Sequence, residues 1–232
     1  MIELYKIGTV KPLTNSETEA LSRGSFSLPA DYLDFLMTYG LGSINELLMI
    51  QKPDQDYIKS NFGDYMDFWT LTESEEQLIL NSQTIATTID GDIITVKNNN
   101  QKPIVLLPRH SDEAVYFENF EKVIAYYNQK YNFNSDLYFD TNYNFEQEYI
   151  SFVSNGQLSK KLFDNVHELF LNEVTFDKLY NAATQPKYII QKIGGWVYFD
   201  ALGKSAVRVK YQTQFKEEAD SIIKLIKDQM KN

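Results

Sequence analysis

Residues 28–45 read LPADYLDFLMTYGLGSIN, and their spacing predicts the helix around which the first half of the chain is organised. Pro29 suits the first turn of a helix, where its missing N–H costs nothing and its fixed φ already fits. An apolar stripe recurs with the 3.6-residue period of a helix, and its members are Leu28, Tyr32, Phe35, Leu36 and Tyr39. Gly40 follows the stripe, where a left-handed cap favours a residue without Cβ. Taken alone, this pattern predicts a short amphipathic helix packed on a sheet and implies no chemistry.

Charge is distributed unevenly along the 232 residues, which carry a formal net charge of −10. Residues 1–135 hold 19 acidic against 10 basic side chains, whereas residues 136–232 hold 13 against 12. We therefore expect no nucleic-acid partner, because phosphate binding depends on Lys and Arg. A basic protein partner is favoured, because complementary charge steers association. Solubility is the open alternative, since a net charge far from zero also keeps a protein dispersed.

Several classes of protein lack support in the sequence. No apolar run approaches the roughly 20 residues that a membrane helix needs, and the start, MIELYKIGTV, does not have the pattern of a secretory signal. The chain has no Cys, which excludes disulfides and Cys-based metal sites. It also lacks a GxSxG, a Walker A loop and a GxGxxG. We expect a cytoplasmic protein without cofactor, metal or membrane contact.

The order of predicted elements in the first half carries a resemblance to a known family. After the 28–42 helix come an apolar run at 44–50, read as one strand, and a helix at 73–81. The parts that carry the resemblance are the 28–42 helix, Trp69-Thr70-Leu71, residues 85–95 with their Gly91-Asp92 turn, the strand 104–107 and the helix that contains residues 119–124. Together they resemble the SUKH superfamily of bacterial immunity proteins and fungal cell-wall-synthesis regulators, over residues 10–133. The resemblance implies a SUKH-like sheet with flanking helices.

Residues 136–232 resemble no family that we recognise, but they have enough apolar stripes for a second core. We interpret the polar stretch 134–148 as the junction between two domains, 1–135 and 136–232. The elements predicted beyond it are helices at 144–153, 158–170 and 175–183, a three-stranded antiparallel meander at 188–193, 196–200 and 206–211, and a C-terminal helix at 215–230. The predicted fold class is therefore α+β, with two domains.

Residues 54–76 are the candidate partner-binding segment, because they carry seven carboxylates against Lys59 alone. Aromatic residues are interleaved with the acids, and Tyr and Trp are enriched at interface hot spots. The proposed contact residues are Asp54, Asp56, Tyr57, Asp64, Tyr65, Asp67, Trp69 and Glu73. In the alternative interpretation, the aromatic side chains face inward and Trp69 belongs to the core.

No catalytic group emerges from the sequence. His110-Ser111-Asp112 contains the residue types of a catalytic triad, but sequence neighbours on an extended chain point apart, and a working triad converges from distant positions. We interpret His167 as part of a solvated helix face rather than as a metal ligand. Asp90-Gly91-Asp92 predicts a hairpin turn, because the further oxygen ligands of a calcium loop are missing.

The resemblance implies a non-enzymatic function. Within the superfamily, the expected role is that of an immunity protein of a bacterial polymorphic toxin system, which binds and neutralises a cognate protein toxin. Such toxins are often basic nucleases or deaminases, which suits the acidic first half. A regulatory protein-interaction scaffold and a carboxylate-dependent hydrolase are the alternatives. A buried pair of Asp or Glu in a deep pocket would favour the hydrolase, and a flat acidic face would favour binding. The toxin's identity and the oligomeric state stay open.

Overall fold

The computed structural model describes residues 2–23, 27–98, 102–133, 137–154, 156–181 and 185–231. Its contacts divide the chain into two units, of which the first comprises Met1–Lys6 and Val10–Thr141, and the second Ile7–Thr9 and Asn142–Asn232. Both units contain helices and strands, so the predicted α+β class is confirmed. The contacts continue the first unit to Thr141, six residues beyond the predicted boundary, because the junction predicted at 134–148 contains a buried strand at Tyr138–Thr141.

The first unit is built on an eight-stranded sheet in the order β1-β8-β2-β3-β4-β5-β6-β7. The strands are β1 (Tyr5–Ile7), β2 (Gly42–Ile44), β3 (Leu48–Asp54), β4 (Gln83–Thr88), β5 (Ile93–Val96), β6 (Ile104–Leu107), β7 (Val115–Phe117) and β8 (Tyr138–Thr141). Neighbours from β8 to β7 pair antiparallel. The single strand predicted at 44–50 was wrong. Asn45 and Glu46 have positive φ angles of 50° and 56° and turn the chain between β2 and β3.

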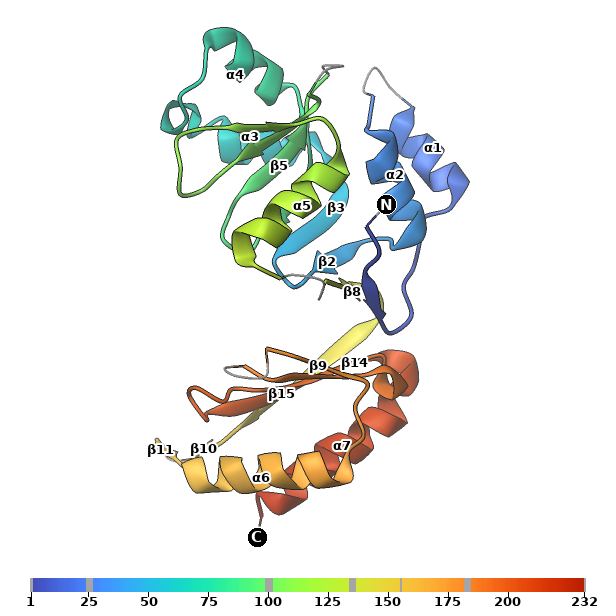
Figure 1. Ribbon diagram of the computed structural model, residues 1–232, viewed down its shortest axis with the longest axis vertical. Helices are drawn as coiled ribbons and strands as arrows, with labels where there is room; N and C mark the ends of the chain where they lie inside the picture. The colour runs from blue at the N-terminus through green and yellow to red at the C-terminus, as the bar shows by residue number, and fades with distance from the viewer. Residues whose placement is uncertain are drawn as a thin grey trace. The chain divides into compact units, whose positions relative to one another are not determined.

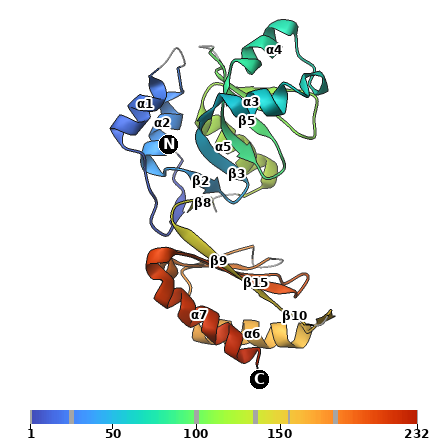
Figure 2. The same ribbon diagram turned by 180° about the vertical axis from the view of Figure 1, so that it is seen from behind.

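Helices cover both faces of this sheet. Successive residues of a strand point to opposite faces, so neighbouring strand residues enter different cores. Ile94 and Leu106 enter a core shared with α2 (Ala30–Thr38) and α5 (Phe120–Tyr131). Ile93 and Leu107 enter another core, shared with α3 (Gln55–Phe62) and α4 (Glu73–Leu80). Accordingly, α5 lies in front of the sheet in Figure 1 and α3 lies in front in Figure 2. Helix α1 (Asn15–Ser22) packs beside α2.

The stretch 28–45 forms helix α2 as predicted, with Pro29 at the N-cap, one position earlier than expected. Phe35 and Leu36 are buried. Gly40 has φ +82°, and its N–H donates to the carbonyl of Leu36 at 3.0 Å, which confirms the left-handed cap. Asp31 links two helices, because its carboxylate accepts the backbone N–H of Glu121 at 2.8 Å in the first turn of α5.

The second unit has a five-stranded antiparallel sheet in the order β12-β13-β14-β15-β9. Its strands are β9 (Phe145–Ser151), β12 (Lys178–Tyr180), β13 (Lys187–Ile190), β14 (Gly195–Phe199) and β15 (Ala206–Gln212), and β10 (Val153–Ser154) and β11 (Gln157–Leu158) form a separate small hairpin. Both views show α6 (Lys160–Glu173) and α7 (Lys216–Gln229) on one face of the sheet (Figures 1 and 2).

The predicted meander is present as β13, β14 and β15, but the sheet has five strands rather than three. The helix predicted at 144–153 was wrong. Residues Phe145–Ser151 instead pair with β15 along the whole of β9, so that a partner more than 50 residues away determines their conformation. The helix predicted at 175–183 was also wrong, because Lys178–Tyr180 forms edge strand β12, although part of that range lies outside the described residues.

Three residues from the beginning of the chain complete the second unit. The N–H of Gly8 donates to Gln191 Oε1 at 2.8 Å. Thr9 makes two hydrogen bonds with the side-chain amide of Gln212, in which its N–H donates at 2.8 Å and its carbonyl accepts at 2.7 Å. Gln212 is 1% exposed, so Thr9 satisfies a buried polar group of the second unit.

Candidate functional site: an acidic surface around an aromatic hollow

The segment 54–76 folds as two short helices joined by a 3-10 turn, η1 (Met66–Phe68). Asp54 is the N-cap of α3, and its Oδ1 accepts the N–H groups of Asp56 at 2.9 Å and Tyr57 at 3.0 Å. Thr72 and Glu75 form a capping box at the start of α4. Local capping therefore positions the segment, and Asp54 has a structural role in addition to its charge.

Trp69 belongs to the core, which decides between the two interpretations for this residue. Its side chain is 8% exposed, and its indole N–H donates to the carbonyl of Pro108 at 3.0 Å. Its ring stacks on buried Phe62, with centroids 5.6 Å apart. A partner could reach only the remaining edge of the indole.

Tyr65 and Phe68 instead face solvent, with 59% and 47% of their surfaces exposed. The ring of Phe68 meets the ring of Trp69 edge-on at 5.1 Å, which holds it at the border between core and surface. Phe68 was not among the predicted contact residues. No sequence signal separates it from Trp69, because the two are neighbours and both are aromatic.

These rings surround a hollow of about 210 Å³. The hollow is lined by Tyr57, Asn61, Tyr65, Phe68, Trp69, Gly91, Ile93 and Arg109. Asp92 fixes the backbone of Arg109, because its Oδ1 accepts the Arg109 N–H at 2.9 Å. The other oxygen of this buried carboxylate accepts the hydroxyl of Tyr127 at 2.8 Å. Three separate parts of the chain are thus brought together: α3 with the loop that follows it, the β4–β5 turn, and the residues after β6.

The acidic residues of the candidate segment carry unneutralised charge, and Asp64 and Asp67 directly precede the lining residues Tyr65 and Phe68 in sequence. Asp56, Asp64, Asp67 and Glu73 are exposed. Within the described part of the chain, none of the four forms an ion pair. Along this segment the structure therefore exposes four predicted carboxylates and the rings of Tyr65 and Phe68, and it buries Trp69.

The paired carboxylates of a carboxylate-dependent hydrolase do not line this hollow. None of its lining residues is a carboxylate. Asp90 and Asp92 lie in the turn between β4 and β5, as predicted, and Asp90 accepts the hydroxyl of Tyr131. His110 is exposed, and no hydrogen bond joins it to any described residue. Among the described residues, no group of three or more His, Asp or Glu could hold a metal ion.

His167 differs from its predicted place on a solvated helix face. Its ring is stacked on Phe199 at 4.3 Å, and its Nε2 lies 2.7 Å from the hydroxyl of Tyr188. Burial lowers the pKa of this imidazole below its usual value, because the charged form loses hydration. The aromatic core of the second unit therefore holds His167 as a structural residue.

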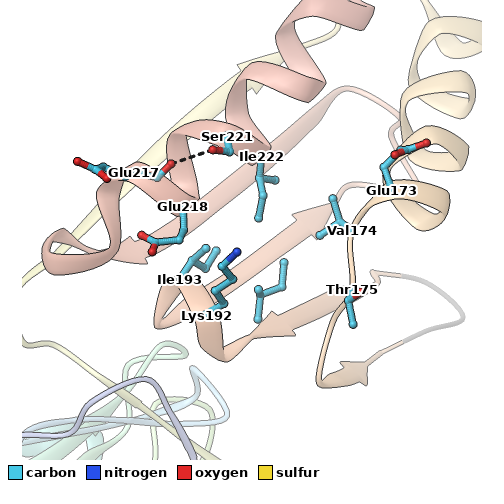
Figure 3. Close-up of a pocket in the computed structure, with 10 residues that line it drawn as sticks. Glu173, Val174, Thr175, Lys192, Ile193, Glu217, Glu218, Ser221 and Ile222 are labelled. Carbon is cyan, nitrogen blue, oxygen red and sulfur yellow. Dashed lines mark hydrogen bonds between the residues drawn. The ribbon is translucent and has the colours of Figure 1, made fainter.

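The second unit has a larger and more open hollow, of about 580 Å³ (Figure 3). Val174, Ile190, Ile193 and Ile222 form its apolar part. Glu173 and Glu217 project away from the other lining residues, and the hydroxyl of Ser221 donates to the backbone carbonyl of Glu217 at 3.0 Å (Figure 3). Lys192 and Glu218 also line the hollow, and within the described part of the chain they form no ion pair with each other.

No family model matches the chain, and no curated protein or solved structure is significantly similar to it. No helix in the described part of the chain is both long and apolar enough to cross a membrane.

Proposed function

We propose that this chain is a non-enzymatic binding protein that engages a basic partner protein through the acidic surface of its first unit. The observation that carries the proposal is the combination of unpaired, exposed carboxylates at Asp56, Asp64 and Asp67 with exposed rings at Tyr65 and Phe68. Aromatic anchors within a polar rim are typical of protein interfaces, and charges at the rim steer association.

The resemblance to the SUKH superfamily supports a role as an immunity protein, which would neutralise a cognate toxin, for instance a basic nuclease or deaminase. The mechanism would be occlusion, in which the carboxylates occupy the positions that substrate phosphates take on the toxin. A regulatory scaffold would use the same kind of surface but would bind a partner without toxicity. Growth rescue therefore separates the two candidates.

The experiment reverses charge on the proposed surface and elsewhere in the same unit. Asp64→Lys/Asp67→Lys is the test variant, and Asp54 is left intact because it caps α3. Glu19→Lys/Asp34→Lys is the matched control, with the same change of net charge. Both control residues are exposed, and they lie on α1 and α2, which pack in the other core of the sheet.

The proposal places the toxin gene next to the gene of this protein, and each variant is co-expressed with the product of that neighbouring gene. The wild type and the control variant should rescue growth, and the folded test variant should rescue it less. Charge-steered association reaches about 10⁸–10⁹ M⁻¹s⁻¹ at low salt, so the test variant should slow association more than it speeds dissociation. Equal protection by all three folded proteins would refute the proposed surface. Binding without any growth phenotype would favour the scaffold.

A further inference from the structure

We infer that the aromatic hollow of the first unit receives one uncharged aromatic ring of the partner, a tyrosine side chain. This inference rests on the proposed function and specifies the group by which the basic partner is anchored. The carboxylates then steer the encounter, while the hollow determines how long the complex lasts.

The size of the hollow favours a single side chain. Its volume of about 210 Å³ lies below the range of about 300–1,000 Å³ that is typical of small-molecule sites. Binding hot spots are commonly aromatic side chains of one protein that enter a small pocket of the other. The exposed rings of Tyr65 and Phe68 border the hollow and would exclude water from such a contact.

The walls of the hollow suit a ring. Four of its eight lining residues are aromatic: Tyr57, Tyr65, Phe68 and Trp69. Aromatic pairs prefer edge-to-face or offset stacking at centroid distances of about 4.5–7 Å, and the Phe68–Trp69 pair at 5.1 Å already has this edge-on geometry. Because Phe62 stacks on Trp69, the indole is held in place before a partner ring arrives.

The charge within the hollow selects an uncharged occupant. Arg109 supplies the only charged side chain among the described lining residues. A Lys or Arg side chain would be repelled by this guanidinium. A carboxylate would be attracted by the exposed guanidinium, but it would meet the negative faces of the rings and lose hydration inside the hollow. An uncharged ring avoids both penalties.

A tyrosine hydroxyl would also find hydrogen-bonding groups at the hollow. The Nδ2 of Asn61 donates to the backbone carbonyl of Tyr57 at 2.9 Å, which leaves the Asn61 Oδ1 as an acceptor. Arg109 can donate, because within the described part of the chain its guanidinium forms no ion pair. An acceptor and a donor beside an aromatic cavity are complementary to a phenol.

The test uses three small probes of similar size and different charge on the full chain. They are p-cresol, n-butylguanidinium and butyrate, as analogues of Tyr, Arg and Glu side chains. Binding is followed by NMR on the indole N–H of Trp69, assigned with the variant Trp69→Phe, while Trp196 in the second unit serves as an internal reference. We expect p-cresol to shift the Trp69 resonance with a Kd of about 1 mM, at least about tenfold tighter than either charged probe.

Asn61→Phe should fill the hollow and abolish the p-cresol shift. Ser60→Phe, at the exposed neighbouring position on α3, is the matched control and should leave the shift unchanged. Equal binding of n-butylguanidinium, or the absence of a Trp69 shift with p-cresol, would overturn the inference. The proposed function fails separately, because it depends on the growth assay with Asp64→Lys/Asp67→Lys. If that variant loses protection and the wild type does not bind p-cresol, the acidic surface is supported and the hollow is excluded as the anchor site.

Discussion

The substitution Phe35→Ala should destabilise the first unit by about 4–5 kcal/mol. Phe35 is 2% exposed, and its ring packs against those of Tyr39 at 4.8 Å, Phe120 at 5.4 Å and Phe139 at 5.8 Å. Truncating a buried Phe to Ala costs about 3–5 kcal/mol. Because each aromatic pair adds about 0.5–1.5 kcal/mol beyond its buried area, three such pairs place the cost in the upper half of that range.

The assay is urea unfolding, followed by the fluorescence of Trp69 in a Trp196→Phe background, so that the signal reports on the first unit alone. With a slope of about 2 kcal/mol per M of urea, the loss corresponds to a midpoint about 2 M lower. Asp34→Ala is the control at the neighbouring position. Its side chain is exposed, and the expected change is about 0.5 kcal/mol or less.

Similar midpoint shifts for Phe35→Ala and Asp34→Ala would refute the assignment of the buried face of α2. If the Ala variant does not fold, Phe35→Leu replaces it, because a Leu side chain keeps much of the apolar volume. That variant should shift the midpoint in the same direction by a smaller amount. A Leu variant as stable as the wild type would contradict the packing argument.

Two further predictions concern single groups. Asp31→Ala removes the carboxylate that caps the start of α5 and should cost about 1 kcal/mol, while Asp31→Asn, which retains an acceptor, should cost less in the same urea assay. His167 has a lowered pKa in the folded state, so unfolding takes up a proton as the pH falls below the unfolded value of about 6.5. The stability of the second unit, followed by Trp196 fluorescence, should therefore decline below that pH, and His167→Gln should weaken the decline.

Local patterns predicted most elements of the first unit, because their signals lie within one helix or hairpin. The apolar stripe gave α2, and the Gly91 turn gave β4 and β5. The failures had distant or unmarked causes. Strand β9 depends on pairing with β15. The chain reverses at Asn45 and Glu46 without a glycine, so no glycine in the sequence marks this turn.

The candidate site was predictable only in part. Charged side chains are almost always exposed, so the outward position of Asp64 and Asp67 follows from their chemistry alone. The inward turn of Trp69 and the outward turn of Phe68 depend on the local path of η1, which has no sequence signature. Arg109 lies 40 residues beyond Trp69 in sequence and reaches the hollow because of how the strands pair in the sheet. Local sequence patterns do not predict that pairing.

The placement of Ile7–Thr9 in the second unit constrains how this gene could exchange parts with others. Gly8 has φ +65°, and a Cβ at this position would come within 2.7 Å of the carbonyl oxygen of Gly194. A recombination event that imported only residues 142–232 would bring Gly194 and Gln212 into a chain whose beginning was selected for other contacts. The second unit can therefore move between genes intact only if two separated stretches of coding sequence move together.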